Sequence, residues 1–427
     1  VMAGAGGGTH TGNIIGGTDG VGTLDVNQNL VVTGSVGTAA NTLASIDVAA
    51  AKTLDIRNGG NNTVEATSIT LVNNATLTIT PGTNTTTVTG DITGDTNEAA
   101  ILVISNGNAG VVAFVGDVGT SSTTELITAT TGGTNNQTVT VTGDWYVKTT
   151  DLDDLDVLQF KGSAAQTVSG VIEGVADRDG KIIVGDGTTA SNVTFQSAIG
   201  GTNDIDDFQV LAAATANVSK NISLEGAAAA SVDINGTLNI DSDANTVSII
   251  ESGAVSGAID IDGTVAVSGA NHVTFDVAAT GGLAIDGTTA LTTELDKGKD
   301  LALNAAGGVT IGVATTETTL IVGNRIDSTD AVTFGASGKN TNLNVRASTQ
   351  FDPTDANGNG TAGQAGDEVL EASGNITVTG SVKVGIDSSS APIPSGSVIH
   401  VMKSAGGTNL AGAIITDVAN LADAKIL

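Results

Sequence analysis

The sequence predicts an all-β protein, built as an elongated β-solenoid that is parallel β-helix-like and has irregular rungs. Three observations lead to this fold class. Apolar and polar residues alternate with a period of two along much of the chain, and one short phrase recurs from end to end. The composition is also unusual, with 58 Gly and only 2% aromatic residues in 427. Small and β-branched residues suit thin, regularly layered strands better than a bulky core.

Short strands are predicted wherever the alternation is strict. Three examples are TLDVNQNLVVTG (23–34), TSITLVNNATLTITPG (67–82) and QTVTVTGDWYV (137–147). Clusters of Gly, Asn, Asp and Ser bound these runs, as turns between strands require. The chain is therefore expected to consist of many short strands.

The recurring phrase joins an alternating strand to a glycine. It reads NLVVTGSV at 29–36 and NITVTGSV at 375–382, and it returns as TVTVTGDW at 138–145 and IDIDGTVAVSG at 259–269. Glycine accepts the backbone conformations that tight corners need. We interpret each copy as one rung with the same structural task, and not as a site.

A longer repeat runs strand, small-residue corner, second strand. It is seen in LASIDVAAAKTLDI (43–56), LDVLQFKGSAAQTVSG (155–170), IDDFQVLAAATANVSKNISLEG (205–226) and VTFDVAATGGLAIDG (273–287). Units of roughly 20–30 residues that cannot bury a face alone are typical of solenoids. An array of β-sandwich domains is the alternative, although it usually needs a bulkier two-sheet core. The residues predicted to face inward are Ile46, Val48, Leu158, Phe160, Phe208, Val210, Phe275 and Val277.

The sequence pattern changes near residue 350. A Gly/Asp/Asn-rich stretch, FDPTDANGNGTAGQAGDE (351–368), interrupts the strands before GNITVTGSVKVG (374–385) resumes them. We therefore divide the chain into a solenoid body, 1–350, and a C-terminal β segment, 351–427.

The charge is strongly one-sided, with 45 Asp and Glu against 15 Lys and Arg and a formal net charge of −30. Such a surface repels nucleic acid and anionic membranes, and it attracts divalent cations. No apolar run is long enough for a transmembrane helix. The complete lack of Cys fits an exported protein whose signal segment has been removed before Val1.

Three stretches resemble passenger segments of alphaproteobacterial autotransporters, especially the rickettsial surface-array (S-layer-like) proteins. They are GNIIGGTDGVGTLDVNQNLVVTGSVG (12–37), IDVAAAKTLDI (46–56) and SGSVIHVMKSAGGTNLAG (395–412). The resemblance implies a β-helical, exported, self-associating surface protein. The chain departs from that family because it ends without the alternating, aromatic-flanked strands of a membrane β-barrel. Either that barrel has been cleaved off, or another outer-membrane or cell-wall anchor retains the protein.

No catalytic constellation is present in the sequence. His10, His272 and His400 lie far apart, and none has a metal-type partner spacing. Paired carboxylates of a β-helical glycan-active enzyme could come from DLDDLD (151–156) or DIDD (204–207), with Asp153 and Asp206 as the residues to test. Sugar sites usually need aromatic platforms, which this chain almost lacks, so we expect no enzymatic activity.

A calcium site is predicted in the stretch after residue 350. DANGNG (355–360) reads D-x-N-x-N-G, which is the first half of an oxygen-ligand calcium loop. The twelfth position is Gly366 where an EF-hand has Glu, so a looser loop closed by later acids is expected; a solvated turn is the alternative. The predicted ligands are Asp352, Asp355, Asn357, Asn359, Asp367 and Glu368.

Together these observations predict a structural surface protein that self-assembles into a layer, sheath or filament with the help of calcium. The open ends and regular edges of a solenoid invite contacts between copies. Calcium would offset the self-repulsion of a chain with a net charge of −30. The first alternative is an adhesin passenger that binds an external surface through one exposed aromatic or apolar patch. The second alternative is the glycan-active enzyme.

Overall fold

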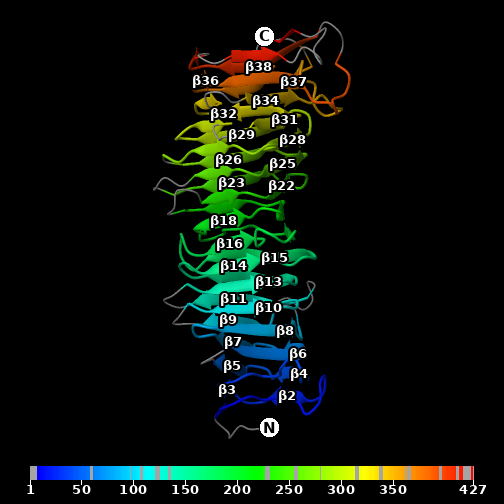
Figure 1. Ribbon diagram of the computed structural model, residues 1–427, viewed down its shortest axis with the longest axis vertical. Coiled ribbons are helices and arrows are strands. Elements are labelled where there is room, and N and C mark those ends of the chain that lie inside the picture. Colours follow the sequence, from blue (N-terminus) through cyan, green and yellow to red (C-terminus); the bar gives the residue numbers. More distant parts are fainter. Residues whose placement is uncertain are drawn as a thin grey trace. The chain divides into compact units, whose positions relative to one another are not determined.

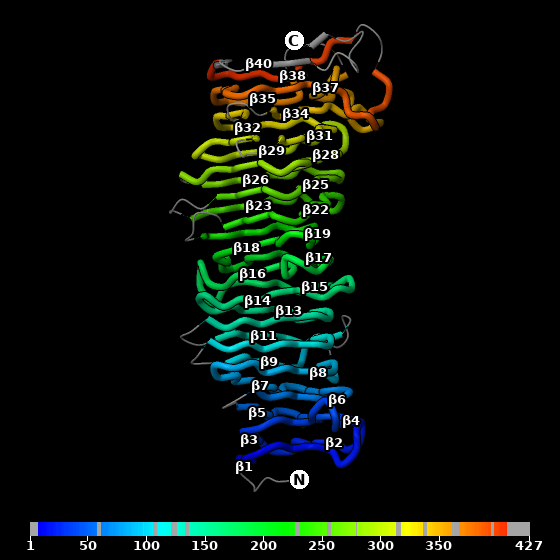
Figure 2. Tube along the Cα trace, in the orientation of Figure 1, coloured from blue at the N-terminus to red at the C-terminus, as the bar shows by residue number. Residues whose placement is uncertain are grey.

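The computed structural model describes residues 7–57, 61–96, 98–105, 109–120, 126–132, 136–226, 231–253, 258–278, 280–312, 317–335, 340–360, 362, 367–393, 397–409, 413–416 and 425–426. The chain divides into two compact units, Val1–Asp206 and Asp207–Leu427. The described residues of both units contain strands and no helix. Within each unit the strands stack one above another (Figure 1), and each turn of the chain lies on the preceding turn (Figure 2).

The first unit contains two parallel sheets whose strands alternate along the chain. One sheet pairs β2 (Thr23–Val26), β4 (Leu43–Val48), β6 (Asn62–Leu71), β8 (Thr85–Gly94), β10 (Val111–Phe114), β12 (Thr138–Val141), β14 (Val157–Phe160) and β16 (Lys181–Val184) in that order. The other pairs β1 (Gly8–His10), β3 (Leu30–Val32), β5 (Thr53–Arg57), β7 (Thr76–Thr80), β9 (Ile101–Ser105), β11 (Leu126–Gly132), β13 (Trp145–Leu152), β15 (Ala165–Gly174) and β17 (Asn192–Phe195).

The second unit has three strands in each turn and therefore three parallel sheets. The first sheet holds β18 (Asp207–Val210), β21 (Val232–Ile234), β24 (Ile259–Ile261), β27 (Leu283–Ile285), β30 (Val309–Ile311), β33 (Val332–Phe334), β36 (Ile376–Val378) and β39 (Thr408–Asn409). The second holds β19 (Thr215–Val218), β22 (Thr237–Asp241), β25 (Thr264–Gly269), β28 (Leu291–Leu295), β31 (Thr318–Val322), β34 (Asn340–Val345), β37 (Ser381–Ile386) and β40 (Ala413–Thr416). The third holds β20 (Ile222–Leu224), β23 (Val247–Glu251), β26 (Val273–Val277), β29 (Asp300–Ala305), β32 (Arg325–Ser328), β35 (Glu368–Ala372), β38 (Val398–Ser404) and β41 (Lys425–Ile426).

Equivalent residues of successive turns lie in register, which confirms the predicted β-solenoid. Leu24 pairs with Ile46, Ile46 pairs with Ile69, and Ile69 pairs with Ile92. The ladders within the two units are parallel, whereas β-sandwiches are built from antiparallel sheets. The alternative of a sandwich array is therefore wrong.

The core consists of the alternate residues that the period of two places inward. All eight residues predicted to face inward are at most 2% exposed, which confirms the prediction. These residues are Ile46, Val48, Leu158, Phe160, Phe208, Val210, Phe275 and Val277. Because the side-chain period is two, a slip of one residue would have moved each set to solvent. Two aromatic pairs pack edge to face inside the first unit, with ring centroids 5.9 Å apart for Phe114 and Trp145 and 5.8 Å apart for Phe160 and Phe195.

Glycines at the corners explain the recurring phrase. In β8 the phrase TVTG ends at Gly90, which has a φ of +102°, and in β15 the phrase TVSG ends at Gly170, with a φ of +86°. A Cβ at Gly90 would lie 1.9 Å from the carbonyl oxygen of Ala66 in the preceding turn. Both the conformation and the space therefore require glycine at this corner.

An aspartate follows several of these corner glycines and ties one turn to the next. The backbone N–H of Asp117 donates to Asp91 Oδ1 at 3.0 Å, and that of Asp144 donates to Asp117 Oδ1 at 2.7 Å. Burial is the main cause that raises the pKa of Asp117, and the like charges of Asp144 and Asp91 raise it further. The recurring Gly-Asp sequence is thus a hydrogen-bonded ladder along one corner.

The segment from residue 351 begins as a loop between β34 and β35. The strands resume in register beyond it, because Leu343 of β34 pairs with Val384 of β37. The predicted boundary at residue 350 concerns domain organisation, and it stays a prediction.

Candidate cation site

Three aspartates converge on the outer face of the second unit, and we call them the Asp triad: Asp260, Asp262 and Asp286. One carboxylate oxygen from each lies within 4.8 Å of the others. Asp260 and Asp286 are half-buried, and Asp262 is exposed. The triad is therefore an open group of three carboxylates at the surface.

The register of β24 and β27 brings the triad together. Asp260 is the middle residue of β24 and faces outward, because Ile259 and Ile261 on either side of it point into the core. Asp262 and Asp286 each follow the last residue of their strand, and these last residues, Ile261 and Ile285, are paired. The two carboxylates consequently occupy the same position in adjacent turns.

Stacked glycines hold the adjoining corner tight. Gly263 follows Asp262, and a Cβ there would lie 2.0 Å from the carbonyl oxygen of Gly236. Gly287 follows Asp286, and its Cβ would lie 2.0 Å from the carbonyl oxygen of Gly263. Successive turns can approach this closely only without side chains, and this close approach positions the carboxylates that precede the glycines.

The electrostatics of the triad favour a bound cation. Burial is the main cause that raises the pKa of Asp260, and the negative charges of Asp262, Asp233 and Asp286 raise it further. Asp233 contributes because it pairs with Asp260 across β21 and β24. A cation among these oxygens would remove both the repulsion and part of the desolvation penalty.

The donor set indicates which ion would bind. Three carboxylates offer only hard oxygen ligands, which suit calcium or magnesium and do not select zinc or copper. Calcium accepts six to eight oxygens in flexible geometry, and it can complete its shell with water at an exposed site. The triad could thus hold a metal ion while leaving coordination positions open to solvent.

Sequence reasoning missed the triad, although it singled out the phrases that carry it. On their own, IDIDG (259–263) and AIDG (284–287) predict only rungs. The overlooked signal is that Asp262 and Asp286 stand one turn apart, each directly before a corner glycine. In a parallel solenoid such residues form a column on the surface, so the spacing alone indicates proximity.

The predicted calcium loop forms a set of turns stabilised by its own side chains. Asp352 Oδ1 accepts from the backbone N–H of Thr354 at 2.9 Å, and Asn357 Oδ1 accepts from that of Asn359 at 2.9 Å. Asp355 is buried, and its Oδ2 accepts from the N–H of Gly360 at 2.8 Å. Asp355 Oδ2 also lies 3.8 Å from Lys297 Nζ.

The two later acids of the predicted loop are buried. Asp367 is 0% exposed, and Glu368 begins β35 with its Oε2 3.8 Å from Lys403 Nζ. In the part of the chain that the structure describes, the Asp triad is the group of three His, Asp or Glu ligands that converge within 4.8 Å. The loop carboxylates do not form such a group by themselves. The loop site stays a prediction.

The other residues considered from the sequence lie in separate places. His272 is on the surface and accepts from the N–H of Asp300 at 3.1 Å, whereas His400 lies on β38.

In the run 151–156, Asp156 is 1% exposed and its Oδ1 accepts from the N–H of Gln137 at 2.7 Å. Burial is the main cause that raises the pKa of Asp156 to about 6.

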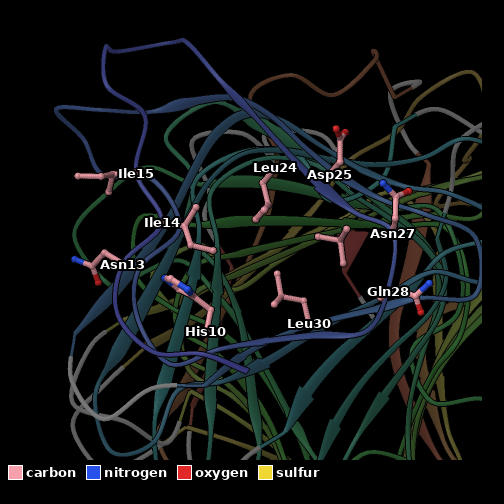
Figure 3. A pocket seen from close by; sticks show the side chains of 10 residues that line it. His10, Asn13, Ile14, Ile15, Leu24, Asp25, Asn27, Gln28 and Leu30 are labelled. Atoms are coloured by element: carbon pink, nitrogen blue, oxygen red, sulfur yellow. The ribbon is translucent and has the colours of Figure 1, made fainter. Parts of the chain in front are cut away.

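A hollow of about 360 Å³ lies at the N-terminal end of the first unit. Figure 3 shows Ile14, Leu24 and Leu30 pointing toward one another across it, and Ile15 pointing away. The hollow is the interior of the first turn of the solenoid. His10 also lines it.

Comparisons of the chain with protein-family models, with curated proteins and with solved structures found no match. Among the described residues, no helix has the length and hydrophobicity needed to cross a bilayer. The chain is a parallel β-solenoid, and it carries a surface group of three aspartates that could hold a metal ion.

Proposed function

We propose that the protein is a structural protein of the cell surface, exported from the cell, which self-assembles into a surface layer, sheath or filament in a calcium-dependent manner. The observation that carries the proposal is the Asp triad on the outer face of the solenoid. An ion held there keeps coordination positions open, so an oxygen from a neighbouring molecule can complete the shell.

The chain's charge supports this dependence on calcium. A net charge of −30 makes copies of the protein repel one another. Ions bound at an exposed column of carboxylates would lower that repulsion where two faces meet. The resemblance to autotransporter passengers agrees with a location outside the cell, and it suggests an outer-membrane or cell-wall anchor as a further partner.

The placement of the aromatic residues favours a scaffold over an adhesin or a glycan-active enzyme. Trp145 is 1% exposed, and all seven Phe residues are buried. Tyr146 is half-buried. Sugar-binding clefts and adhesive patches usually present aromatic side chains to the ligand, whereas this chain uses its aromatic residues to fill the core.

The proposal is tested by titrating calcium into the protein by calorimetry and following assembly by light scattering. The variant carrying Asp262→Asn and Asp286→Asn should bind calcium at least tenfold more weakly and should no longer scatter when calcium is added. A matched control carries Asp243→Asn and Asp276→Asn, at two exposed positions of the same unit outside the triad. The control loses the same charge and should behave like the wild type.

The same titration tests whether the predicted loop also binds calcium. If the loop binds a second calcium ion, the variant carrying Asp355→Asn and Asp367→Asn should bind one ion fewer per chain than the wild type. The triad should still bind its ion in this variant. Equal calcium affinity in the triad variant and the wild type would show that the Asp triad is not a calcium site. If a chelator does not reverse assembly, assembly does not depend on calcium and this part of the proposal is wrong.

A further inference from the structure

Three buried side-chain oxygens lie in or next to the loop that follows β34, and they have no hydrogen-bond donor. They are Asn324 Oδ1, Asp355 Oδ1 and Glu368 Oε2, and none of them accepts a hydrogen bond in the described part of the chain. The three residues are 1%, 7% and 5% exposed, respectively. A buried oxygen without a donor is costly, so three of them in one region require an explanation.

The register of β32 with β35 places two of these residues in adjacent turns. Ile326 pairs with Leu370, and Asn324 and Glu368 each stand two residues before that pair. The side-chain nitrogen of Asn324 donates to the backbone oxygen of Arg325, which leaves Oδ1 as the amide atom without a partner. Asn324 and Glu368 therefore occupy the same corner in neighbouring turns.

The loop that carries Asp355 reaches back to the turn before Asn324. Asp355 Oδ2 lies 3.8 Å from Lys297 Nζ, and a Cβ added at Gly358 would lie 3.4 Å from the backbone nitrogen of Gly298. The corner that the loop contacts here leads into β29, which pairs with β32 in the turn of Asn324. The loop thus begins one turn after Asn324 and touches the turn before it.

This region buries three carboxylates with little compensating charge. Asp355, Asp367 and Glu368 are at most 7% exposed. The lysines paired with Asp355 and Glu368 each hold their nitrogen 3.8 Å from the carboxylate, too far for a hydrogen bond. These lysines, Lys297 and Lys403, keep 57% and 42% of their side chains exposed. Buried carboxylates are normally paired closely or coordinate a metal ion, so a divalent cation would supply the missing charge.

We infer that a calcium ion is held between the loop and this corner, with Asn324 Oδ1, Asp355 Oδ1 and Glu368 Oε2 among its ligands. Calcium accepts carboxylate and amide oxygens, and backbone carbonyls or water can complete its six to eight positions. Magnesium keeps several of its waters and suits a buried site less well. The ion would tie the loop to the preceding turn, and it is independent of the Asp triad and of self-assembly.

The ligand set differs from the local sequence motif of the loop. Asp352 Oδ1 and Asn357 Oδ1 already accept hydrogen bonds from backbone N–H groups of the loop itself, and Asn359 is exposed. Asn324 lies outside the motif, on the preceding turn. Variants at Asn324 and at the loop asparagines therefore distinguish the buried site from the motif.

Burial also predicts how the ion behaves. Because its ligand oxygens are shielded from solvent, the ion can leave only when the loop opens or the protein unfolds. The exposed Asp triad, by contrast, should lose its ion to a chelator. The buried ion should therefore stay with the folded protein under conditions that strip the triad.

Elemental analysis of the purified protein tests this inference. The protein is refolded from urea in calcium and then dialysed against excess chelator. The wild type should retain about one calcium ion per chain, and urea added together with the chelator should release it. Asn324→Ala should retain at least about tenfold less calcium, because it removes a ligand. The control carrying Asn357→Ala and Asn359→Ala should retain as much calcium as the wild type.

Further variants cover a folding defect and separate the two proposed sites. Glu368→Gln keeps the shape of the side chain and removes its charge, so it repeats the test if Asn324→Ala does not fold. Asn324→Asp keeps an oxygen and should retain the ion. The variant carrying Asp262→Asn and Asp286→Asn should also retain it, so failure of the Asp triad leaves this site unaffected.

Two results would overturn the buried site. One is a wild type that holds no calcium after dialysis, and the other is equal retention of calcium by the wild type, Asn324→Ala and Glu368→Gln. Loss of the ion from the variant carrying Asn357→Ala and Asn359→Ala, with retention by Asn324→Ala, would instead assign the ion to the exposed motif of the loop.

Discussion

Asp156 shows how burial changes the chemistry of one side chain in this acidic protein. The residue is 1% exposed, and its Oδ1 accepts a backbone hydrogen bond from Gln137. Burial outweighs that bond and raises the pKa to about 6. Because one pKa unit corresponds to about 1.4 kcal/mol, ionising Asp156 in the folded protein costs on the order of 3 kcal/mol.

This value predicts a pH dependence of stability with a definite sign. The folded protein binds a proton at Asp156 between pH 3.8 and about 6, whereas the unfolded chain has released it. The contribution of Asp156 to the free energy of unfolding is therefore fully present below pH 3.8, and it is lost as the pH rises to about 6. Asp156→Asn keeps the acceptor for Gln137 and removes the charge, so it should stabilise the protein by about 2 kcal/mol at pH 7.

Urea unfolding followed by Trp145 fluorescence provides the measurement, since the single Trp of the chain is buried in the same unit. The difference between the wild type and Asp156→Asn should grow from pH 4 to pH 7. The exposed neighbour Asp154 supplies the control, and Asp154→Asn should leave stability within about 0.5 kcal/mol of the wild type. A difference that stays constant with pH would contradict the assignment of the raised pKa to Asp156.

At the scale of an element, each turn depends on the close approach of backbone atoms at its corners. Glycine is required at Gly263 by space and not by conformation, because a Cβ added there would lie 2.0 Å from the backbone oxygen of Gly236. A backbone atom held in a parallel ladder cannot move aside as the end of a flexible side chain can. The turn itself would have to shift.

Gly263→Ala should therefore destabilise the second unit by about 1–3 kcal/mol, the range for overpacking a tight site. Gly282→Ala is the control, because its Cβ would meet Gly308 O at an ordinary 3.6 Å. Calorimetric melting of both variants separates the two cases. Equal melting temperatures for Gly263→Ala and Gly282→Ala would show that the stacked corner tolerates a side chain. Calcium affinity should also fall in Gly263→Ala, since the shifted turn carries Asp262.

For the whole molecule, the dominant property is a net charge of −30. Adjacent strands in a sheet lie about 4.8 Å apart, which is less than the Debye length of about 8 Å at physiological salt. Simple salt therefore screens the repulsion between neighbouring turns only in part. A divalent ion bound directly between carboxylates acts where the screening is weakest.

Calcium should consequently stabilise the protein more than sodium chloride of equal ionic strength does. At a free calcium concentration of 100 times Kd, one site adds about 2.7 kcal/mol to the free energy of unfolding. The measurement is the melting temperature in calcium, in matched sodium chloride and in chelator. The variant carrying Asp262→Asn and Asp286→Asn should lose the calcium-specific part of the shift. Equal shifts in calcium and in matched sodium chloride would instead indicate general screening.

The sequence by itself determined the fold class and the inward face of the strands. A period of two specifies which residues share a face, so the alternation alone places Phe208 and Val210 in the core, where both are buried. The recurrence of the phrase ending in glycine likewise predicted stacked rungs. Both properties are local, because alternation and turn chemistry act over a few residues.

Only the tertiary structure decided which polar residues meet. Asp262 and Asp286 are 24 positions apart in the chain, and they converge because the register of β24 with β27 aligns them in neighbouring turns. The loop after residue 350 has the more familiar local motif, yet its carboxylates turn to nearby backbone groups and lysines. The physical reason is that a ligand set on a solenoid forms across turns. Its geometry then depends on the length of each turn and on the glycines that let the turns approach, and not on spacing within one stretch of sequence.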